Sequence, residues 1–314
     1  GNDPILGLHT YADGLIVCAG TGIYFSQDGT SWLQVNRISS GGGDDYTTFT
    51  GKSLLARTNQ KQCSFSLFSN SYDYGELIIA DGANQLFSFR MEGTGNLNTR
   101  TFFTSEVQVD TTKSVKYVTV HDHHLIAAGV EDNLNTLYYS TKNTFSSFNN
   151  TQKIAISDQI VGIKGFREDL FIFCENSIHK LININDSNNI AIVPVAENVG
   201  CLSGYSIQEI GGDLIFLAPD GLRTVAGTAR IGDVELGTVS KAIQPTVTDL
   251  ANNINLYTIS SVVLREKSQY RLFYTNTGAD NTAQRGIIGT LRPDGFQWSE
   301  TRGIEVTAIG SGFN

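Results

Sequence analysis

A short hairpin motif recurs six times along the 314-residue chain and constrains the fold more than any other sequence feature. Each copy has a polar or acidic turn, an apolar run of strand length, a second turn and a second apolar strand. The copies lie about 45–60 residues apart and begin at Asp13, Gly75, His123, Glu168, Gly212 and Tyr270, of which the last is the most diverged. A chain built this way repeats one β-structural unit.

Further strand-like segments flank the hairpins. Residues 115–120, 160–165, 205–210 and 261–264 precede a hairpin, and the more polar segments 32–35 and 190–195 follow one. Four strands in each repeat of about 50 residues is typical of a β-propeller blade. A β-solenoid has shorter repeats, and a pair of β-sandwiches would not repeat one motif six times. We therefore predict an all-β, β-propeller-like fold with about six four-stranded blades.

The predicted blades have approximate boundaries. They cover residues 4–50, 51–112, 113–158, 159–200, 201–255 and 256–303 of one propeller-like domain, 1–314. Residues 304–314 contain the run IEVTAIG, which predicts a strand that closes the ring or begins a further blade. Residue 1 is glycine, Met91 is the single methionine, and we recognise no signal-peptide pattern. We therefore expect this sequence to be part of a longer chain.

Residues 240–254 depart from the β pattern. Ser240 stands at a plausible helix N-cap, and apolar residues follow at helical spacing at positions 243, 247, 250 and 254. Pro245 falls in the first turn, where a helix tolerates proline. We predict a short inserted amphipathic helix that either covers one end of the core or serves as an interface.

Two turns resemble the Asp-box of sialidase-type propellers. The segment 26–32 (SQDGTSW) is a shortened form of it, and 293–298 (PDGFQW) is a weaker echo. In such a turn the aspartate carboxylate accepts backbone N–H groups and the tryptophan packs under the loop. The resemblance therefore implies a structural role for Asp28 and Trp32, with no chemistry attached.

Charge, hydropathy and cysteine spacing each argue against a class of protein or site. Lys and Arg number 22 against 31 Asp and Glu, a formal net charge of −9, which argues against tight non-specific nucleic-acid binding. No apolar run approaches the ~18–20 residues that span a bilayer. The four cysteines match neither a zinc site nor a disulfide framework, and Cys18 and Cys174 lie in apolar runs typical of a core.

Candidate chemical sites are few. The cluster His121–His124 has ligand-type residues, but its position favours a polar turn between two strands. Asp44 and Asp45 follow a glycine run that lacks a phosphate fingerprint, and they are weak candidates for Mg²⁺ or Ca²⁺. The sequons at Asn149 and Asn185 are most simply chance. We therefore predict no catalytic, cofactor-binding or metal-binding residues and no cofactor.

Residues 200–243 carry a family resemblance. The phrase GDLIFLAPDGLR, then a variable loop, then LGTVSKAIQP opening a short helix, is similar to the tail nozzle (tail tubular, or DNA-stabilisation) proteins of short-tailed bacteriophages. The earlier hairpin GLIVCAGTGIYFS and the strand SIHKLIN have a residue pattern similar to that of these proteins. The resemblance implies a non-enzymatic structural protein of the virion tail, assembled in the host cytoplasm.

What the resemblance implies about partners is also specific. Such proteins form a ring, usually a homo-hexamer, below the portal and adaptor, where they extend the DNA channel, retain the genome and dock tail fibres or spikes. An acidic wall would let DNA slide past without specific binding, and no membrane is involved. Two alternatives stay open: a carbohydrate-binding or sialidase-like propeller, including a phage receptor-binding protein, and a cellular propeller scaffold for protein–protein interactions.

Overall fold

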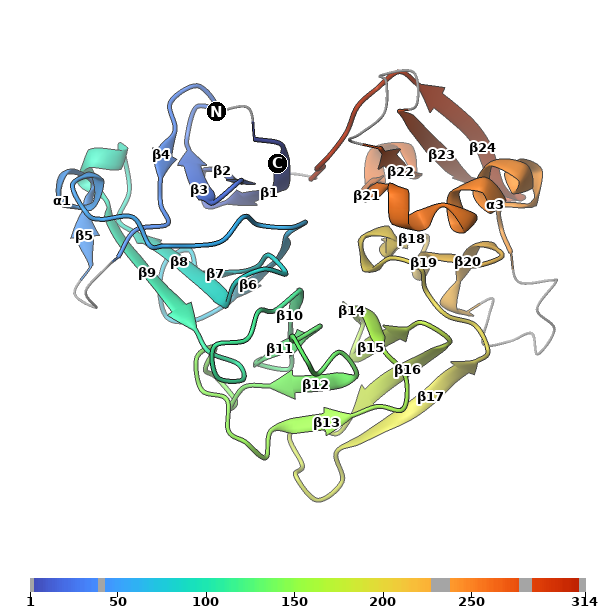
Figure 1. Ribbon diagram of the computed structural model, residues 1–314, viewed down its shortest axis with the longest axis horizontal. Helices are drawn as coiled ribbons and strands as arrows, with labels where there is room; N and C mark the ends of the chain where they lie inside the picture. The colour runs from blue at the N-terminus through green and yellow to red at the C-terminus, as the bar shows by residue number, and fades with distance from the viewer. Residues whose placement is uncertain (1–2, 39–42, 227–237, 277–283, 311–314) are drawn as a thin grey trace. The chain divides into compact units, whose positions relative to one another are not determined.

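The computed structural model describes residues 3–38, 43–226, 238–276 and 284–310 (Figure 1). Within these residues the strands form six antiparallel sheets, which we number blade 1 to blade 6 in chain order. The chain divides into two compact units, each with three blades: unit 1 is Gly1–Ile156 and unit 2 is Ser157–Ser311. None of the described helices is long and apolar enough to cross a membrane.

Unit 1 contains blades 1 to 3 and two short helices. Blade 1 is β1 (Ile5–Tyr11), β2 (Gly14–Ala19), β3 (Gly22–Ser26) and β4 (Leu33–Gln34). Blade 2 is β5 (Asp44–Asp45), β6 (Ser64–Phe68), β7 (Glu76–Ala80), β8 (Leu86–Glu92) and β9 (Thr101–Val107), in the order β5-β9-β8-β7-β6. Blade 3 is β10 (Tyr117–His121), β11 (His124–Ala128), β12 (Thr136–Tyr139) and β13 (Lys153–Ala155). The helices are α1 (Tyr46–Thr50) and the 3₁₀ turn η1 (Leu97–Thr99).

Unit 2 contains blades 4 to 6. Blade 4 is β14 (Ile160–Phe166), β15 (Asp169–Cys174), β16 (Ser177–Ile182) and β17 (Ala191–Glu197). Blade 5 is β18 (Gln208–Ile210), β19 (Asp213–Ala218) and β20 (Gly221–Thr224). Blade 6 is β21 (Thr258–Leu264), β22 (Gln269–Thr275), β23 (Arg285–Arg292) and β24 (Gly295–Arg302). The described helices of unit 2 are α3 (Gln244–Asn252) and the 3₁₀ turns η2 (Gly204–Ser206), η4 (Lys241–Ile243), η5 (Ile254–Leu256) and η6 (Arg265–Lys267).

The blades confirm the predicted fold class, a β-propeller of six blades built from antiparallel strands. Consecutive strands pair in each sheet, except that β5 pairs with β9, so each blade contains an antiparallel meander. Blade 2 gains β5 as an extra edge strand, and in blade 5 an isolated antiparallel bridge joins Arg223 to Thr238 beside its three described strands. The strand predicted within residues 304–314 is wrong over residues 304–310, which form none, and residues 311–314 lie outside the described residues. Side chains hold this segment instead: Thr275 and Ser260 donate to the carbonyl groups of Val306 and Thr307.

Apolar clusters join neighbouring blades inside each unit. One cluster connects blades 1 and 2, a second connects blades 2 and 3, and in unit 2 similar clusters connect blade 4 with 5 and blade 5 with 6. The alternation of the strands places every second side chain in such a cluster. The blades of each unit are thus held together mainly by buried apolar area.

The predicted helix is confirmed as α3. Val247 and Leu250 are fully buried on it and contact the apolar cluster of blades 5 and 6, and Pro245 lies in its first turn. The predicted N-cap is wrong in detail: the Ser240 hydroxyl accepts the Leu222 backbone N–H at 3.0 Å and makes no capping bond. The helix therefore covers the core of blades 5 and 6, as one of the two predicted roles requires.

Candidate functional site

The His121–His124 segment is a hairpin turn. His121 pairs with His124 across β10 and β11, and the two turn residues have φ values of +46° and +65°, as a two-residue hairpin loop requires. The His124 ring is buried, with Nδ1 2.6 Å from the Ser140 carbonyl oxygen. Across the described residues, no group of three or more His, Cys, Asp or Glu side chains could hold a metal ion.

The carboxylates of Asp44 and Asp45 have structural partners. Asp44 forms an ion pair with Lys52 at 3.2 Å. Asp45 caps helix α1, where Oδ1 accepts the Thr48 N–H at 2.9 Å and the Thr47 hydroxyl at 2.7 Å. The backbone hydrogen bond from Thr48 is the main cause that lowers the pKa of Asp45 to about 2. The carboxylates of Asp44 and Asp45 therefore stabilise strand β5 and the start of helix α1.

The two Asp-box-like turns behave differently from each other. Asp28 accepts the backbone N–H groups of Thr30 and Ser31 at 2.8 and 2.7 Å, and these bonds hold its pKa well below the usual range. The expected packing of Trp32 under that loop is wrong, since the residue is 44% exposed. In the second turn the Trp298 ring stacks on Phe296, and its Nε1–H donates to the backbone carbonyl of Val239.

The four cysteines lie in the core. All are buried and unpaired, which confirms the prediction for Cys18 and Cys174. Burial raises the pKa of Cys174 and of Cys201 to about 12, so both thiols are protonated at neutral pH. A thiol of this kind packs as a small apolar group and is a poor nucleophile.

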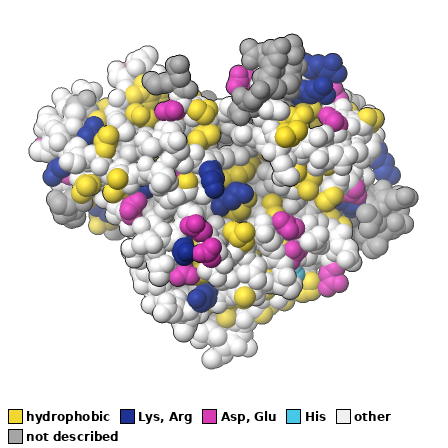
Figure 2. All heavy atoms as spheres, viewed as in Figure 1, with side chains coloured by type: hydrophobic (Ala, Val, Ile, Leu, Met, Phe, Trp, Pro, Cys, Tyr) yellow, Lys and Arg dark blue, Asp and Glu magenta, His cyan; other side chains and the backbone are white. Residues whose placement is uncertain are grey.

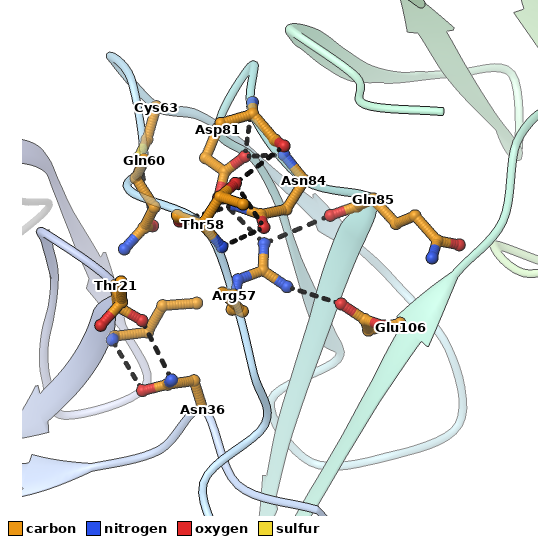
Figure 3. Close-up of polar contacts among 12 residues, drawn as sticks. Thr21, Asn36, Arg57, Thr58, Gln60, Cys63, Asp81, Asn84, Gln85 and Glu106 are labelled. Atoms are coloured by element: carbon orange, nitrogen blue, oxygen red, sulfur yellow. Dashed lines mark hydrogen bonds and ion pairs between the residues drawn. The ribbon is translucent and has the colours of Figure 1, made fainter. Parts of the chain in front are cut away.

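A buried ionic network lies in unit 1 and is centred on Arg57 (Figure 3). Its guanidinium donates to Asp81 Oδ2 at 2.9 Å, to Glu106 Oε1 at 3.1 Å and to the Gln85 carbonyl at 3.2 Å. The side chains of Arg57 and Asp81 are both 0% exposed. A buried charge of this kind is tolerated because it is paired and hydrogen-bonded.

Asp81 also organises the turn between β7 and β8. Its Oδ1 accepts the backbone N–H groups of Ala83 and Asn84 at 3.0 and 2.8 Å. The Asn84 side chain in turn accepts the Thr58 backbone N–H at 2.8 Å, next to Arg57 (Figure 3). Because these oxygens hold backbone groups and a permanent cation, the network fastens the β5–β6 connection to the sheet of blade 2.

An open depression of about 400 Å³ lies on blades 1 and 2 of unit 1. Ala12 in the β1–β2 turn lines it on one side, and the β6–β7 loop supplies Asn70, Tyr72, Asp73 and Tyr74. The Tyr72 residue is 42% exposed. The depression thus combines aromatic surface with an amide and a carboxylate, which suits binding of a small polar molecule.

Arg90 stacks on the ring of Tyr72, which lines this depression. Its guanidinium lies 3.6 Å from the Tyr72 ring centroid and 3.9 Å from that of Phe103. It also forms ion pairs with Glu92 at 2.9 Å and Glu76 at 3.5 Å. Burial is the main cause that raises the pKa of Glu76. Sequence reasoning missed this cluster; the Tyr-Asp-Tyr run in a loop was its one local signal.

Comparisons with known proteins assign no family. No protein-family model and no curated protein matches the chain. It is similar to solved structures of BBS1N in complex with ARL6DN (14% identity, 71% of this chain and 63% of that one, TM-score 0.43) and of the Neurospora crassa Pan2 WD40 domain (11%, 70% and 61%, TM-score 0.40). It is also similar to the computationally designed Ika8 protein (7%, 100% and 92%, TM-score 0.46). The chain spans less than two thirds of the first two structures, and at these identities none of them indicates a function.

Proposed function

We propose that this β-propeller is a non-enzymatic structural protein, a subunit of the tail nozzle ring of a short-tailed bacteriophage. The observation that carries the proposal is the phrase in residues 200–243, which is similar to nozzle proteins in its hairpin and in the start of its helix. The described parts of the phrase contain the β19–β20 hairpin, and helix α3 begins directly after it. The loop between them, 227–237, lies outside the described residues.

The two halves of the phrase are joined by hydrogen bonds. The Leu222 N–H, in the hairpin, donates to the Ser240 hydroxyl at 3.0 Å. Gln244, at the start of α3, donates from its side chain to the Asp220 carbonyl at 2.7 Å. The similarity thus concerns residues that fold against each other, which makes it a stronger argument than a match between separate short runs.

The charge pattern supports a DNA conduit that does not grip its cargo. Figure 2 shows acidic side chains interspersed with Lys and Arg on the visible face. Backbone hydrogen bonds in exposed turns lower the pKa of Asp28 and Asp45, and hydrogen bonds from Asn189 and Asn188 lower that of Asp186. These groups stay ionised at neutral pH. With a net charge of −9, such a surface repels phosphate groups.

The proposed partners follow from the proposed role. They are further copies of this chain in a ring, the portal and adaptor above it, and tail fibres or spikes, while genomic DNA passes without specific binding. A homo-oligomeric ring requires heterologous contacts that close after a fixed number of copies.

Mass photometry tests the ring directly. The purified chain is measured alone and with the portal–adaptor complex of the phage that encodes it, and we expect a closed ring in the second sample at least. Gel retardation of linear duplex DNA at low salt is the companion measurement, with a basic DNA-binding protein as positive control, and we expect no retardation. A chain that stays monomeric in both samples and retards DNA would refute the proposal.

A further inference from the structure

We propose that the depression between the β1–β2 turn and the β6–β7 loop binds a neutral hexopyranose unit of a glycan. The inference goes beyond the nozzle role and does not depend on it, because it rests on unit 1 alone. The depression has a volume of about 400 Å³, which lies within the range of small-molecule sites. The depression is open to solvent, as a site for one unit of a longer chain must be.

Tyr72 provides the apolar platform. One face of its ring is occupied by the Arg90 guanidinium, 3.6 Å from the ring centroid, and the same guanidinium lies 3.9 Å from the Phe103 ring centroid. The ring is therefore fixed in orientation while 42% of the residue stays exposed. A fixed, exposed aromatic ring presents the kind of surface on which the C–H face of a pyranose stacks.

The polar groups of the depression match hydroxyl groups. Asn70 and Asp73 line it, and their amide and carboxylate can bond neighbouring hydroxyls of a sugar ring. Asp73 is the one charged side chain among the described residues that line the depression. A negative charge there disfavours sialic acids, phosphates and other anions, so the ligand class is a neutral sugar.

The loop that carries these residues is built before any ligand arrives. Asn70 Oδ1 accepts the Tyr72 N–H at 3.1 Å, and Tyr72 in turn accepts the Gly75 N–H at 3.2 Å. The buried Tyr11 hydroxyl donates to the Gly75 carbonyl at 2.9 Å. Gly75 has φ +69°, and a Cβ there would lie 2.8 Å from the Phe68 carbonyl oxygen. A ligand therefore does not have to order the loop, which reduces the free energy that binding costs.

Saturation-transfer difference NMR tests the proposal. The probes are methyl α-mannoside, methyl β-galactoside and N-acetylglucosamine at millimolar concentration, with N-acetylneuraminic acid as the anionic comparison. We expect transfer to the ring protons of at least one neutral sugar and none to the acid. Tyr72→Ala should weaken binding by at least about tenfold, whereas Tyr72→Phe should retain it.

Matched variants separate binding from folding. Trp32→Ala removes an aromatic side chain of similar exposure outside the depression and should leave the signal unchanged. Asp73→Ala changes an exposed loop residue and should weaken the signal even where Tyr72→Ala does not fold by circular dichroism. Transfer to no neutral sugar, transfer that both depression variants leave unchanged, or preference for the acid would overturn the proposal.

Discussion

Blades 1 and 2 of unit 1 and blades 5 and 6 of unit 2 bury their polar groups with different chemistry. Blades 1 and 2 contain three largely buried arginines, Arg57, Arg90 and Arg100, each paired with at least one carboxylate. In blades 5 and 6 the apolar cluster is covered by α3, and the polar tips of aromatic residues bond to backbone carbonyls. Sheets of one topology thus tolerate two solutions to the burial of polar groups.

The aromatic donors of blades 5 and 6 are neutral. The Tyr270 hydroxyl donates to the Ser206 carbonyl at 2.8 Å, and burial raises the pKa of this tyrosine. Trp298 Nε1 donates to the Val239 carbonyl at 2.7 Å. Losing a neutral hydrogen bond costs less free energy than leaving a buried charge without its partner. The comparison therefore predicts that unit 1 is the more sensitive of the two to loss of a single polar partner.

The largest expected effect is at Arg57. Arg57→Leu leaves the fully buried Asp81 carboxylate without its cation, and we expect the free energy of unfolding to fall by about 3–5 kcal/mol. Arg223→Leu is the matched change in unit 2, where the partner Asp220 has a side chain 41% exposed and can turn to water. There we expect a loss of roughly 1–2 kcal/mol. Urea unfolding followed by circular dichroism measures both losses. Equal losses would show that the two units do not differ in their sensitivity to the loss of a polar partner.

A smaller effect separates the two tryptophans, one in each unit. Trp298→Phe keeps the ring stacked on Phe296 but removes the bond to Val239, so we expect a loss of about 1 kcal/mol. Trp32→Phe changes an exposed side chain and should stay within about 0.5 kcal/mol of the parent. Thermal unfolding of the two variants checks this, and a larger loss for Trp32→Phe would mean that its loop matters more than its exposure indicates.

The smallest expected effect is a pH dependence. Two hydrogen bonds of 2.7 and 2.6 Å from Arg100 are the main cause that lowers the pKa of Asp13 from its ordinary value of 3.8. A lowered acid pKa stabilises the fold above the ordinary value, and this stabilisation is lost as the pH falls through the folded-state value. The difference in stability between the parent and Asp13→Asn should therefore close below pH 3.8.

Trp298→Phe provides the control for this titration. It removes a neutral hydrogen bond, so its difference from the parent should not depend on pH over the same range. Urea unfolding at a series of pH values compares the two. A difference for Asp13→Asn that grows as the pH falls would show that the ion pair with Arg100 does not stabilise the folded state.

Local signals predicted much of the fold. The hairpin motif, the Asp28 turn and the Pro245 helix each depend on residues a few positions apart, so their spacing in the sequence carries the physics. Helix α1 was missed because a single turn is too short to show helical periodicity. The run at 304–310 resembles the first strand of a blade in its sequence, but side-chain hydrogen bonds hold it without a ladder.

The polar network and the depression could not be predicted in the same way. Arg57 lies 24 positions from Asp81 and 49 from Glu106, and Asp13 lies 87 positions from Arg100. Pairs of this kind leave no periodic pattern, because tertiary structure alone brings them together. Tyr72 and Asp73 are neighbours in one loop, but Arg90, which orients the Tyr72 ring, comes from strand β8.

Immunogold electron microscopy tests the proposed place of this chain in the tail of a short-tailed phage. An antibody raised against the purified chain is applied to virions of the phage that encodes it. We expect label on the tail, below the portal vertex, in intact particles and in isolated tails. Virions without label, in a preparation where the antibody detects the chain in the host lysate, would contradict it.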